Sequence, residues 1–208
     1  MAITDILTFT GIAFSVLFPL INPIGGVPAF SGLTAHDTPD FRRTQARKIS
    51  VNVFIILITF LLIGKLLLEL FGISLGVLEI AGGLIVANTG WQMVNSKPDD
   101  EKQNTAKVQN VDISFMPMAM PILSGPGAIG AVIGMSTNAK QIEDYIGFVI
   151  GITGIGLVTY LFLIASIPLM KKLGSTGINV LTRMMGFFIL AIAVNLVYKG
   201  IISLSRAG

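Results

Sequence analysis

The sequence has no cysteine and only one histidine, His36, among its 208 residues. Without cysteine there is no disulfide, thiolate metal site or cysteine nucleophile, and a single histidine excludes a multi-histidine metal centre. Charged residues are also scarce, at 12% of the chain, against about 25% in a soluble domain. Too few polar side chains remain to cover a water-facing globule, so an ordinary soluble enzyme, a disordered chain and a fibrous protein are all disfavoured.

Long apolar stretches dominate the chain, which is 53% hydrophobic with a mean hydropathy of +0.82. A helix needs about 20 apolar residues to cross a hydrocarbon core ~30 Å thick, where no water can hydrogen-bond an exposed backbone. The stretches are apolar on every side, whereas the strands of a membrane β-barrel alternate with a period of two. The sequence therefore predicts an all-α membrane protein with six transmembrane helices, at Ile6–Phe30, Ile49–Leu70, Leu75–Val94, Ile113–Met135, Ile146–Met170 and Gly177–Leu204.

Basic residues in the predicted loops set the orientation, because cytoplasmic loops carry an excess of Lys and Arg. The loops after the first, third and fifth helices hold nine such residues, and the opposite face holds four. This predicts a plasma (inner) membrane protein with both termini outside. Thr38 and Pro39 predict a helix start, as N-cap and first helical residue, ahead of Arg42, Arg43 and Arg47. Two interpretations of these arginines stay open: contacts to acidic lipid headgroups and, more commonly, topology signals alone.

Prolines repeat at a fixed interval along the chain. Three pairs are each separated by 98 residues: Pro19 and Pro117, Pro23 and Pro121, Pro28 and Pro126. The chain therefore reads as two three-helix repeats, residues 1–94 and 113–208, joined by a cytoplasmic linker at 95–112 in a single membrane domain. Because three is odd, the second repeat is expected to be inverted in the membrane, a plan common among secondary transporters.

The two proline-rich segments form the predicted solute site. Proline removes a backbone N–H and clashes with the carbonyl one turn earlier, so the first and fourth helices should be broken or kinked. Helix N-termini attract carboxylates, and unwound carbonyls attract an ammonium, which favours a small zwitterionic solute. The residues expected to bind it are Asn22, Pro23, Gly25, Gly26, Pro121, Ser124, Gly125, Pro126, Gly127 and Asn88. The alternative is that these prolines and glycines only kink packed helices.

Two charged residues, Glu79 and Arg183, fall inside predicted membrane helices. A charge within the bilayer is costly and is by default a functional candidate. The pair is expected to act as a coupling relay or as a structural ion pair, and snorkelling towards the interface is the third interpretation.

Several segments carry a family resemblance. They are Asn22–Phe30 (NPIGGVPAF), Phe71–Ser74 (FGIS), Ala81–Gly83 (AGG), Pro117–Pro121 (PMAMP), Gly125–Ile129 (GPGAI) and Gly177–Gly186 (GINVLTRMMG). At these residues the chain resembles the MarC family of six-span inner-membrane proteins, described as neutral amino acid transporters and related to the LysE-type exporters. The resemblance implies movement of small neutral amino acids such as glycine or alanine, by ion coupling or as export.

Together these features predict a secondary transporter that moves a small zwitterion by alternating access, with H+ or Na+ as a coupling cation. The alternative is an exporter of a cation or another small solute. It is disfavoured because hard cations need several carboxylates, and only Glu79 lies well inside a predicted helix. No enzymatic activity, cofactor, metal site or nucleic-acid partner is expected, and a homo-oligomer in the lipid bilayer stays open.

Overall fold

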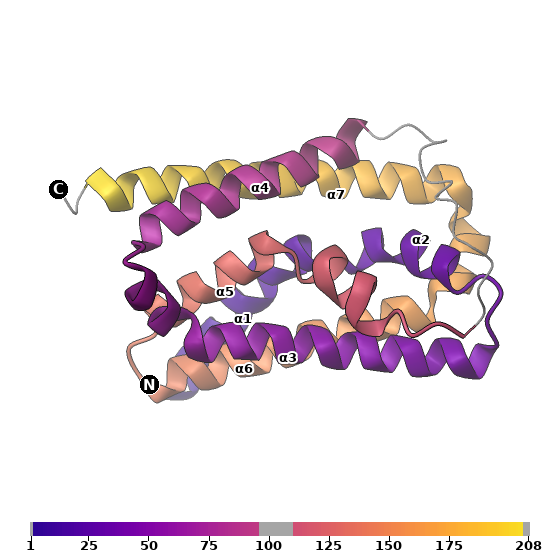
Figure 1. Cartoon of the computed structure of the whole chain (residues 1–208), viewed down its shortest axis with the longest axis horizontal. Helices are drawn as coiled ribbons and strands as arrows, with labels where there is room; N and C mark the ends of the chain where they lie inside the picture. Colours follow the sequence, from indigo (N-terminus) through magenta and orange to yellow (C-terminus); the bar gives the residue numbers. More distant parts are fainter. Residues whose placement is uncertain (1, 96–109, 206–208) are drawn as a thin grey trace.

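The computed structural model describes residues 2–95 and 110–205, and within them every regular element is a helix. Figure 1 shows their arrangement. In chain order the elements are α1 (Ala2–Ile21), α2 (Pro23–Leu33), α3 (Pro39–Phe71), α4 (Leu75–Asn95), η1 (Ser114–Leu123), α5 (Pro126–Asn138), α6 (Ile142–Ile164) and α7 (Ser166–Ser205). Most of the predicted linker at 95–112 lies outside the described residues.

Four helical stretches in the described ranges are long and apolar enough to cross a membrane: Ile3–Ile21, Pro39–Phe71, Ile142–Ile164 and Thr176–Ser205. The pair η1 and α5, bent by 71°, would make a fifth. Helix α4 is not in this set, because Glu79, Asn88 and Gln92 lower its hydropathy. The all-α architecture is confirmed, and the count of six spans stays a prediction.

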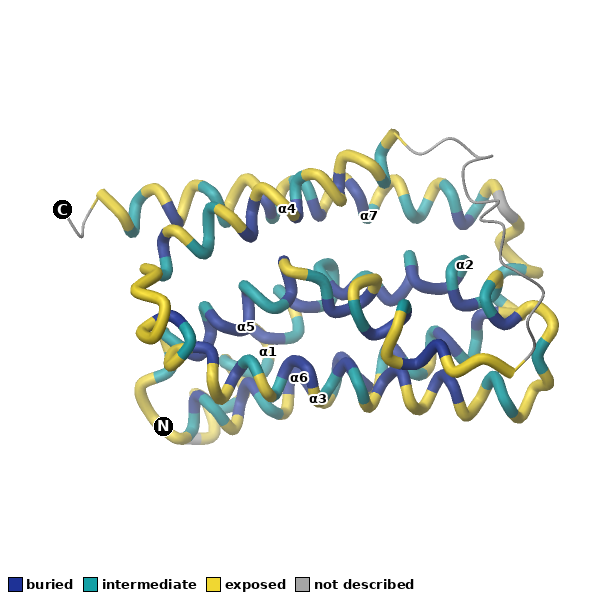
Figure 2. The backbone as a smooth tube through the Cα atoms, viewed as in Figure 1, coloured by how far each residue is buried: buried dark blue, intermediate teal, exposed yellow. Residues whose placement is uncertain are grey.

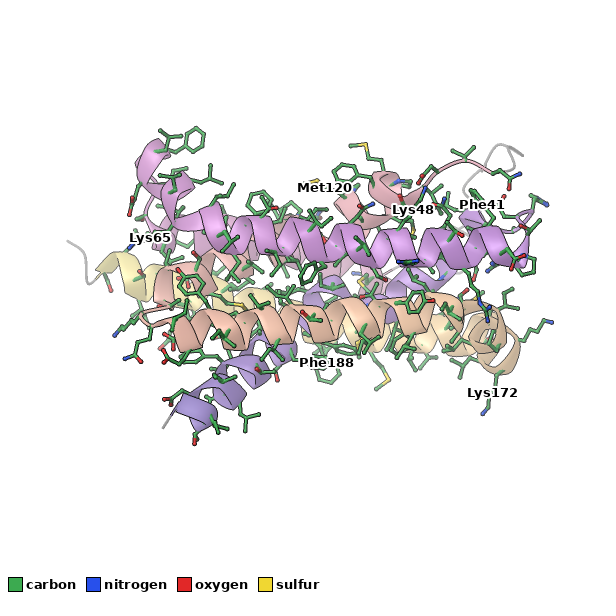
Figure 3. The ribbon with its side chains drawn as sticks, turned by 90° about the horizontal axis from the view of Figure 1, so that it is seen from below. Phe41, Lys48, Lys65, Met120, Lys172 and Phe188 are labelled. Atoms are coloured by element: carbon green, nitrogen blue, oxygen red, sulfur yellow. The ribbon has the colours of Figure 1, made fainter. Side chains whose placement is uncertain are left out.

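The helices form two outer layers with the broken segments between them (Figure 1). Helices α4 and α7 make the largest helix–helix contact of the described chain and form one layer. Helices α3 and α6 form the other and lie side by side when seen from below, with Phe41 and Lys65 towards opposite ends of α3 (Figure 3). Between the layers lie α1, α2, η1 and α5.

Helix α1 begins and α7 ends at one end of the bundle, while α3 begins and α6 ends at the other (Figure 1). Two contacts tie the start of the second half to α3 and the turn before it: the Asn110 amide donates to Asp37 Oδ1 at 2.8 Å, and Lys48 Nζ lies 2.7 Å from Asp112 Oδ2. The side of the membrane on which each end lies stays a prediction.

Helix α3 begins and ends with sequence-encoded caps. Thr38 is the N-cap, its hydroxyl accepting from the Phe41 amide at 3.3 Å, and Pro39 is the first helical residue, which confirms the predicted start. At the other end Gly72 has φ 63°, a left-handed conformation that glycine adopts without steric cost. The helix therefore begins ten residues before the predicted membrane stretch at Ile49.

The buried core lies between α1, α3, α6 and the broken segments and includes Leu17, Leu57 and Ile152. Figure 2 colours the buried residues of these elements dark blue. The α4–α7 pair buries few large side chains and relies on glycines instead. A Cβ built at Gly83 would lie 3.0 Å from the Ala193 carbonyl, and one at Gly90 would lie 2.9 Å from the Gly186 carbonyl. Small residues let membrane helices approach closely where lipid supplies no hydrophobic driving force.

The structure corrects two predicted helix boundaries. The first predicted helix, Ile6–Phe30, is two helices that meet at Asn22. The fifth, Ile146–Met170, ends six residues early, at Ile164, although the apolar run continues. The chain turns at Ala165 and α7 starts at Ser166, with Pro168 in its first turn, where a missing N–H costs nothing. Helix α7 then bends at Gly174, whose φ is 65°.

Candidate functional site

The first broken segment turns at Asn22, between α1 and α2. Asn22 has φ 47° and ψ 64°. A residue before proline is disfavoured in the right-handed helical region, and asparagine tolerates the left-handed one better than most residues. The Asn22 Oδ1 caps α2 by accepting from the Gly25 amide at 3.1 Å, and its Nδ2 lies 3.6 Å from Met93 Sδ on α4. Thioether sulfur is a weak acceptor, so the Asn22 amide group retains donor capacity.

The second broken segment is η1 and the turn into α5. Its helical bonds span five residues: the Met118 amide donates to the Ile113 carbonyl at 3.2 Å, and the Ser124 amide donates to the Ala119 carbonyl at 2.8 Å. Met116 and Met120 are extended, because each precedes a proline. Gly125 is also extended, and Pro126 opens α5.

The proline repeat is only partly reproduced in the backbone. Pro23 and Pro121 both stand at breaks, as expected from their spacing. Pro19 and Pro28, however, lie within α1 and α2, whereas Pro126 begins α5. The two halves therefore break at related positions with different local geometry, and the inverted repeat stays a prediction.

The two broken segments meet between the layers. A Cβ built at Gly26 of α2 would lie 3.0 Å from Leu123 Cδ2 of η1. Beside this contact lie two cavities of about 190 and 400 Å³. They adjoin because five lining residues belong to both: Leu20, Thr89, Pro121, Ile122 and Ile189. We call the two cavities together the broken-helix site.

Seven of the ten predicted binding residues line this site: Asn22, Gly25, Gly26, Pro121, Gly125, Pro126 and Gly127. Three do not. Pro23 is buried in the first turn of α2, and Ser124 is fully buried beside the cavities, its hydroxyl without a partner among the described residues. Asn88 is exposed on α4 and lines neither cavity. The adjacent Thr89 lines both cavities instead, because successive helical residues point about 100° apart.

Sequence reasoning missed Thr89 and Gln92 of α4 and Thr182 of α7, which line the larger cavity. Thr89 and Gln92 are three residues apart and so lie on one face of α4, and this spacing is the sequence signal that could have identified these two. No aspartate, glutamate, lysine or arginine lines either cavity. Within residues 2–95 and 110–205, no group of three His, Asp or Glu side chains is placed to hold a metal ion.

Comparison with known proteins identifies the family of this chain. A model of the MarC family of integral membrane proteins matches residues 7–204. The chain belongs to the MarC family. It is 36% identical to the UPF0056 membrane protein YvbG of Bacillus subtilis, over 90% of this chain and 92% of that protein. It is 30% identical to the UPF0056 inner membrane protein MarC of Escherichia coli, over 97% and 98% of the two chains. No solved structure matches.

The resemblance inferred from sequence is therefore confirmed, and the chain is an integral membrane protein. The matched range contains both broken segments and nearly all of the α4–α7 pair of this MarC-family chain. The relatives' names state a membrane location and give no substrate.

Glu79 and Arg183 lie at opposite ends of the α4–α7 pair. The two helices run antiparallel, with Gly76 against Gly200 and Gly90 against Gly186. Glu79 is therefore near the Gly76 end of the pair, while Arg183 lies beyond Gly186 at the other end. Of the three interpretations, the structural ion pair between them is incompatible with this arrangement, because the helix register separates the two side chains by most of the length of α4.

Proposed function

We propose that this MarC-family protein is a secondary transporter that moves a small zwitterion, such as glycine or alanine, across the plasma membrane by alternating access. One observation carries the proposal. Broken helices from both halves of the sequence meet at one site, which is lined by apolar side chains, glycines and a few neutral polar groups and is bordered by α4 and α7.

The size of the site favours a small solute. The smaller of its two cavities, beside the first turn of α5, is about 190 Å³, which is below the ~300–1,000 Å³ range of pockets for drug-sized ligands. Glycines at positions 25, 26, 125 and 127 leave little side-chain bulk around the space.

The chemistry of the site suits opposite charges on one neutral molecule. Gly125, the N-cap of α5, makes no side-chain cap bond, so the first amides of α5, at Gly127 and Ala128, are available to a carboxylate. Across the site, the side-chain oxygens of Thr89 and Gln92 are available to an ammonium. A net charge on the solute would have no lining counter-ion, so a zwitterion fits better than an anion or a cation.

The layers provide a route for alternating access. Close glycine contacts hold α4 and α7 together as one unit. This unit touches the rest of the bundle chiefly where α4 packs on α5 and α7 packs on α2, which is beside the broken-helix site. Equivalent contacts from the two halves are what a pair of inverted repeats would make, and rocking between such halves would expose the site to each side in turn.

The test is uptake by proteoliposomes together with a thermal-shift screen. We expect labelled glycine, alanine or serine to accumulate under a H+ or Na+ gradient, and the same solutes to raise the melting temperature by mass action. Protein-free liposomes are the negative control. The Gln92→Ala variant, which lacks one of the side-chain oxygens proposed to bind the ammonium, should take up less solute. No uptake with any of the three solutes under any gradient would refute the substrate class, and stabilisation by a cation alone would favour the cation-exporter alternative.

A further inference from the structure

A groove on the outside of the bundle, between α3 and α6, is separate from the broken-helix site. It encloses about 520 Å³ and shares no lining residue with that site. It exists because Gly156 of α6 faces α3 without a side chain. A Cβ there would be 3.6 Å from the Ser50 carbonyl and 3.9 Å from Phe54 Cβ, which are ordinary van der Waals distances. The floor of the groove therefore has room for a methyl group.

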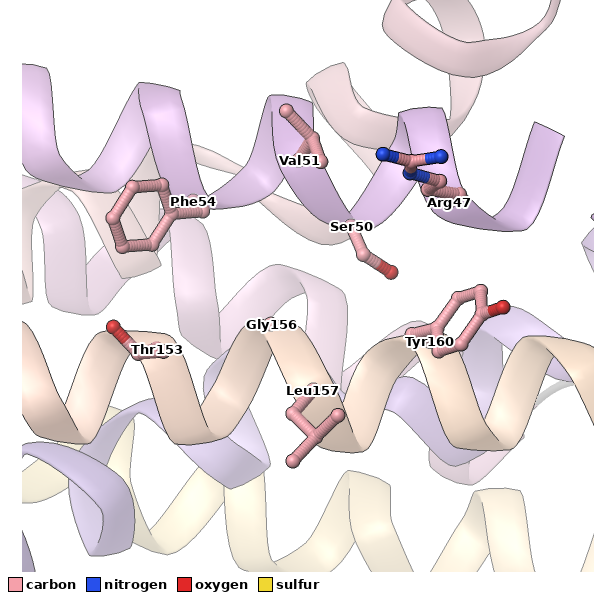
Figure 4. A pocket seen from close by; sticks show the side chains of 8 residues that line it. All are labelled: Arg47, Ser50, Val51, Phe54, Thr153, Gly156, Leu157 and Tyr160. Atoms are coloured by element: carbon pink, nitrogen blue, oxygen red, sulfur yellow. The ribbon is translucent and has the colours of Figure 1, made fainter. Parts of the chain in front are cut away.

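The groove carries Arg47 and Tyr160 at one end and is mainly apolar further along, where the hydroxyls of Ser50 and Thr153 donate to carbonyls of their own helices (Figure 4). The Arg47 guanidinium and the Tyr160 hydroxyl lie at the end of the bundle where α3 begins and α6 ends. Val51, Phe54 and Leu157 line the groove further along. From Arg47 to Phe54 the helix rises about 10 Å.

Arg47 has no ion pair or side-chain hydrogen bond within the part of the chain that the structure describes. Its neighbours on α3 differ in this respect. Lys48 pairs with Asp112 at 2.7 Å. Arg42 donates to the Ser166 hydroxyl at 3.3 Å and lies over the Phe30 ring, 5.6 Å from its centre.

The depth of Arg47 also matters, because it lies two residues before the predicted membrane stretch that starts at Ile49. This places its charge at headgroup level, above an apolar groove. Arginine side chains at this depth attract anionic headgroups, and Tyr hydroxyls favour the same interface.

We propose that the groove binds one anionic phospholipid. Its phosphate lies between Arg47 and Tyr160, and one acyl chain runs along Val51, Phe54 and Leu157 over Gly156. A soluble acidic partner would match the arginine but would leave the apolar groove unfilled within the bilayer. The proposal does not rest on transport, so it can fail while the proposed function stands.

The experiment titrates phosphatidylglycerol or phosphatidylcholine, with identical acyl chains, into the full-length protein in detergent. Native mass spectrometry counts retained lipids. We expect one phosphatidylglycerol to be retained in preference to phosphatidylcholine, and Arg47→Gln to weaken its binding about fivefold, as expected for one arginine near the membrane surface. Arg43→Gln is the matched control: Arg43 is also exposed on α3, one turn earlier, and does not line the groove.

A second pair of variants tests the acyl-chain part of the groove. Gly156→Leu should fill the floor and reduce retention of phosphatidylglycerol, while Gly156→Ala should leave it unchanged. Equal retention of the two lipids, or equal effects of the Arg43 and Arg47 substitutions, would overturn the proposal. Retention of a second protein chain in place of lipid, lost in Arg47→Gln, would also overturn it by showing an interface between copies.

Discussion

Replacing Gly83 by alanine should destabilise the α4–α7 pair, because this glycine lies at one of the close approaches of the two backbones. The added Cβ would lie 2.8 Å from Val197 Cγ2, 3.0 Å from the Ala193 carbonyl and 3.1 Å from the Val197 amide. Two of these three atoms belong to the backbone, so a rotamer change cannot relieve the contact. Overpacking of this kind costs about 1–3 kcal/mol.

Gly82→Ala is the matched control for this substitution. A Cβ at Gly82 meets no atom within 4 Å, and both substitutions gain the same helix propensity, up to about 1 kcal/mol. The difference between the two variants therefore isolates the packing term, and about 1–3 kcal/mol corresponds to roughly 2–12 °C in melting temperature. Circular dichroism in detergent measures it. If Gly83→Ala melts at or above the temperature of Gly82→Ala, the close packing of α4 on α7 is refuted.

Two further predictions concern the first break and the loop contact. Asn22→Gly keeps a left-handed backbone but removes the side-chain cap of α2, so we expect a folded protein, destabilised by only about 0.3 kcal/mol, whose melting temperature no longer responds to glycine or alanine; an unchanged response would remove Asn22 from the site. Hydrogen bonds from Lys48 and Ser114 hold the pKa of Asp112 well below its usual range. The stabilisation is therefore complete above the unfolded pKa near 4 and is lost as the pH falls towards the folded value. The exposure of the pair limits it to under about 1 kcal/mol. Melting curves of the wild type and Asp112→Asn should converge as the pH falls from about 5 to 2; curves that stay parallel would contradict this linkage.

The breaks in the first and fourth segments could be predicted because they follow from local covalent chemistry. Proline disfavours the right-handed helical conformation for the preceding residue, and Asn22, Met120 and Gly125 all precede proline and all depart from it. Local chemistry did not show which prolines would interrupt a helix. Pro28 stays inside α2 while Pro126 begins α5, and that difference depends on the neighbouring segments.

The residues that α4 contributes to the site were harder to predict than the breaks. They depend on which face of α4 is turned towards the broken segments. Asn88 and Thr89 are adjacent and both polar, and an error of one residue turns the face by about 100°. The same applies to Glu79 and Arg183, whose separation depends on the antiparallel register of α4 and α7. Hydropathy also could not show that α6 ends at Ile164, because the residues after it are equally apolar.

The groove between α3 and α6 separates two basic residues near the start of α3 that the sequence alone treats alike. Orientation requires only that such charges be present, so a topology signal need not distinguish Arg43 from Arg47. The structure does distinguish them, because Arg47 alone of the two lines the groove. A lipid site and a topology signal can therefore share one cluster of arginines.

The most direct test of the central claim uses the absence of cysteine in the chain. A single cysteine at Thr89, which lines both cavities, should be modified by a small thiol reagent and protected when glycine or alanine is bound. A cysteine at the adjacent Asn88, exposed but outside the site, should react equally with and without the solute. Protection at Thr89 and not at Asn88 is the expected result; equal protection at both positions, or none at either with any small amino acid, would contradict a solute site between the broken helices.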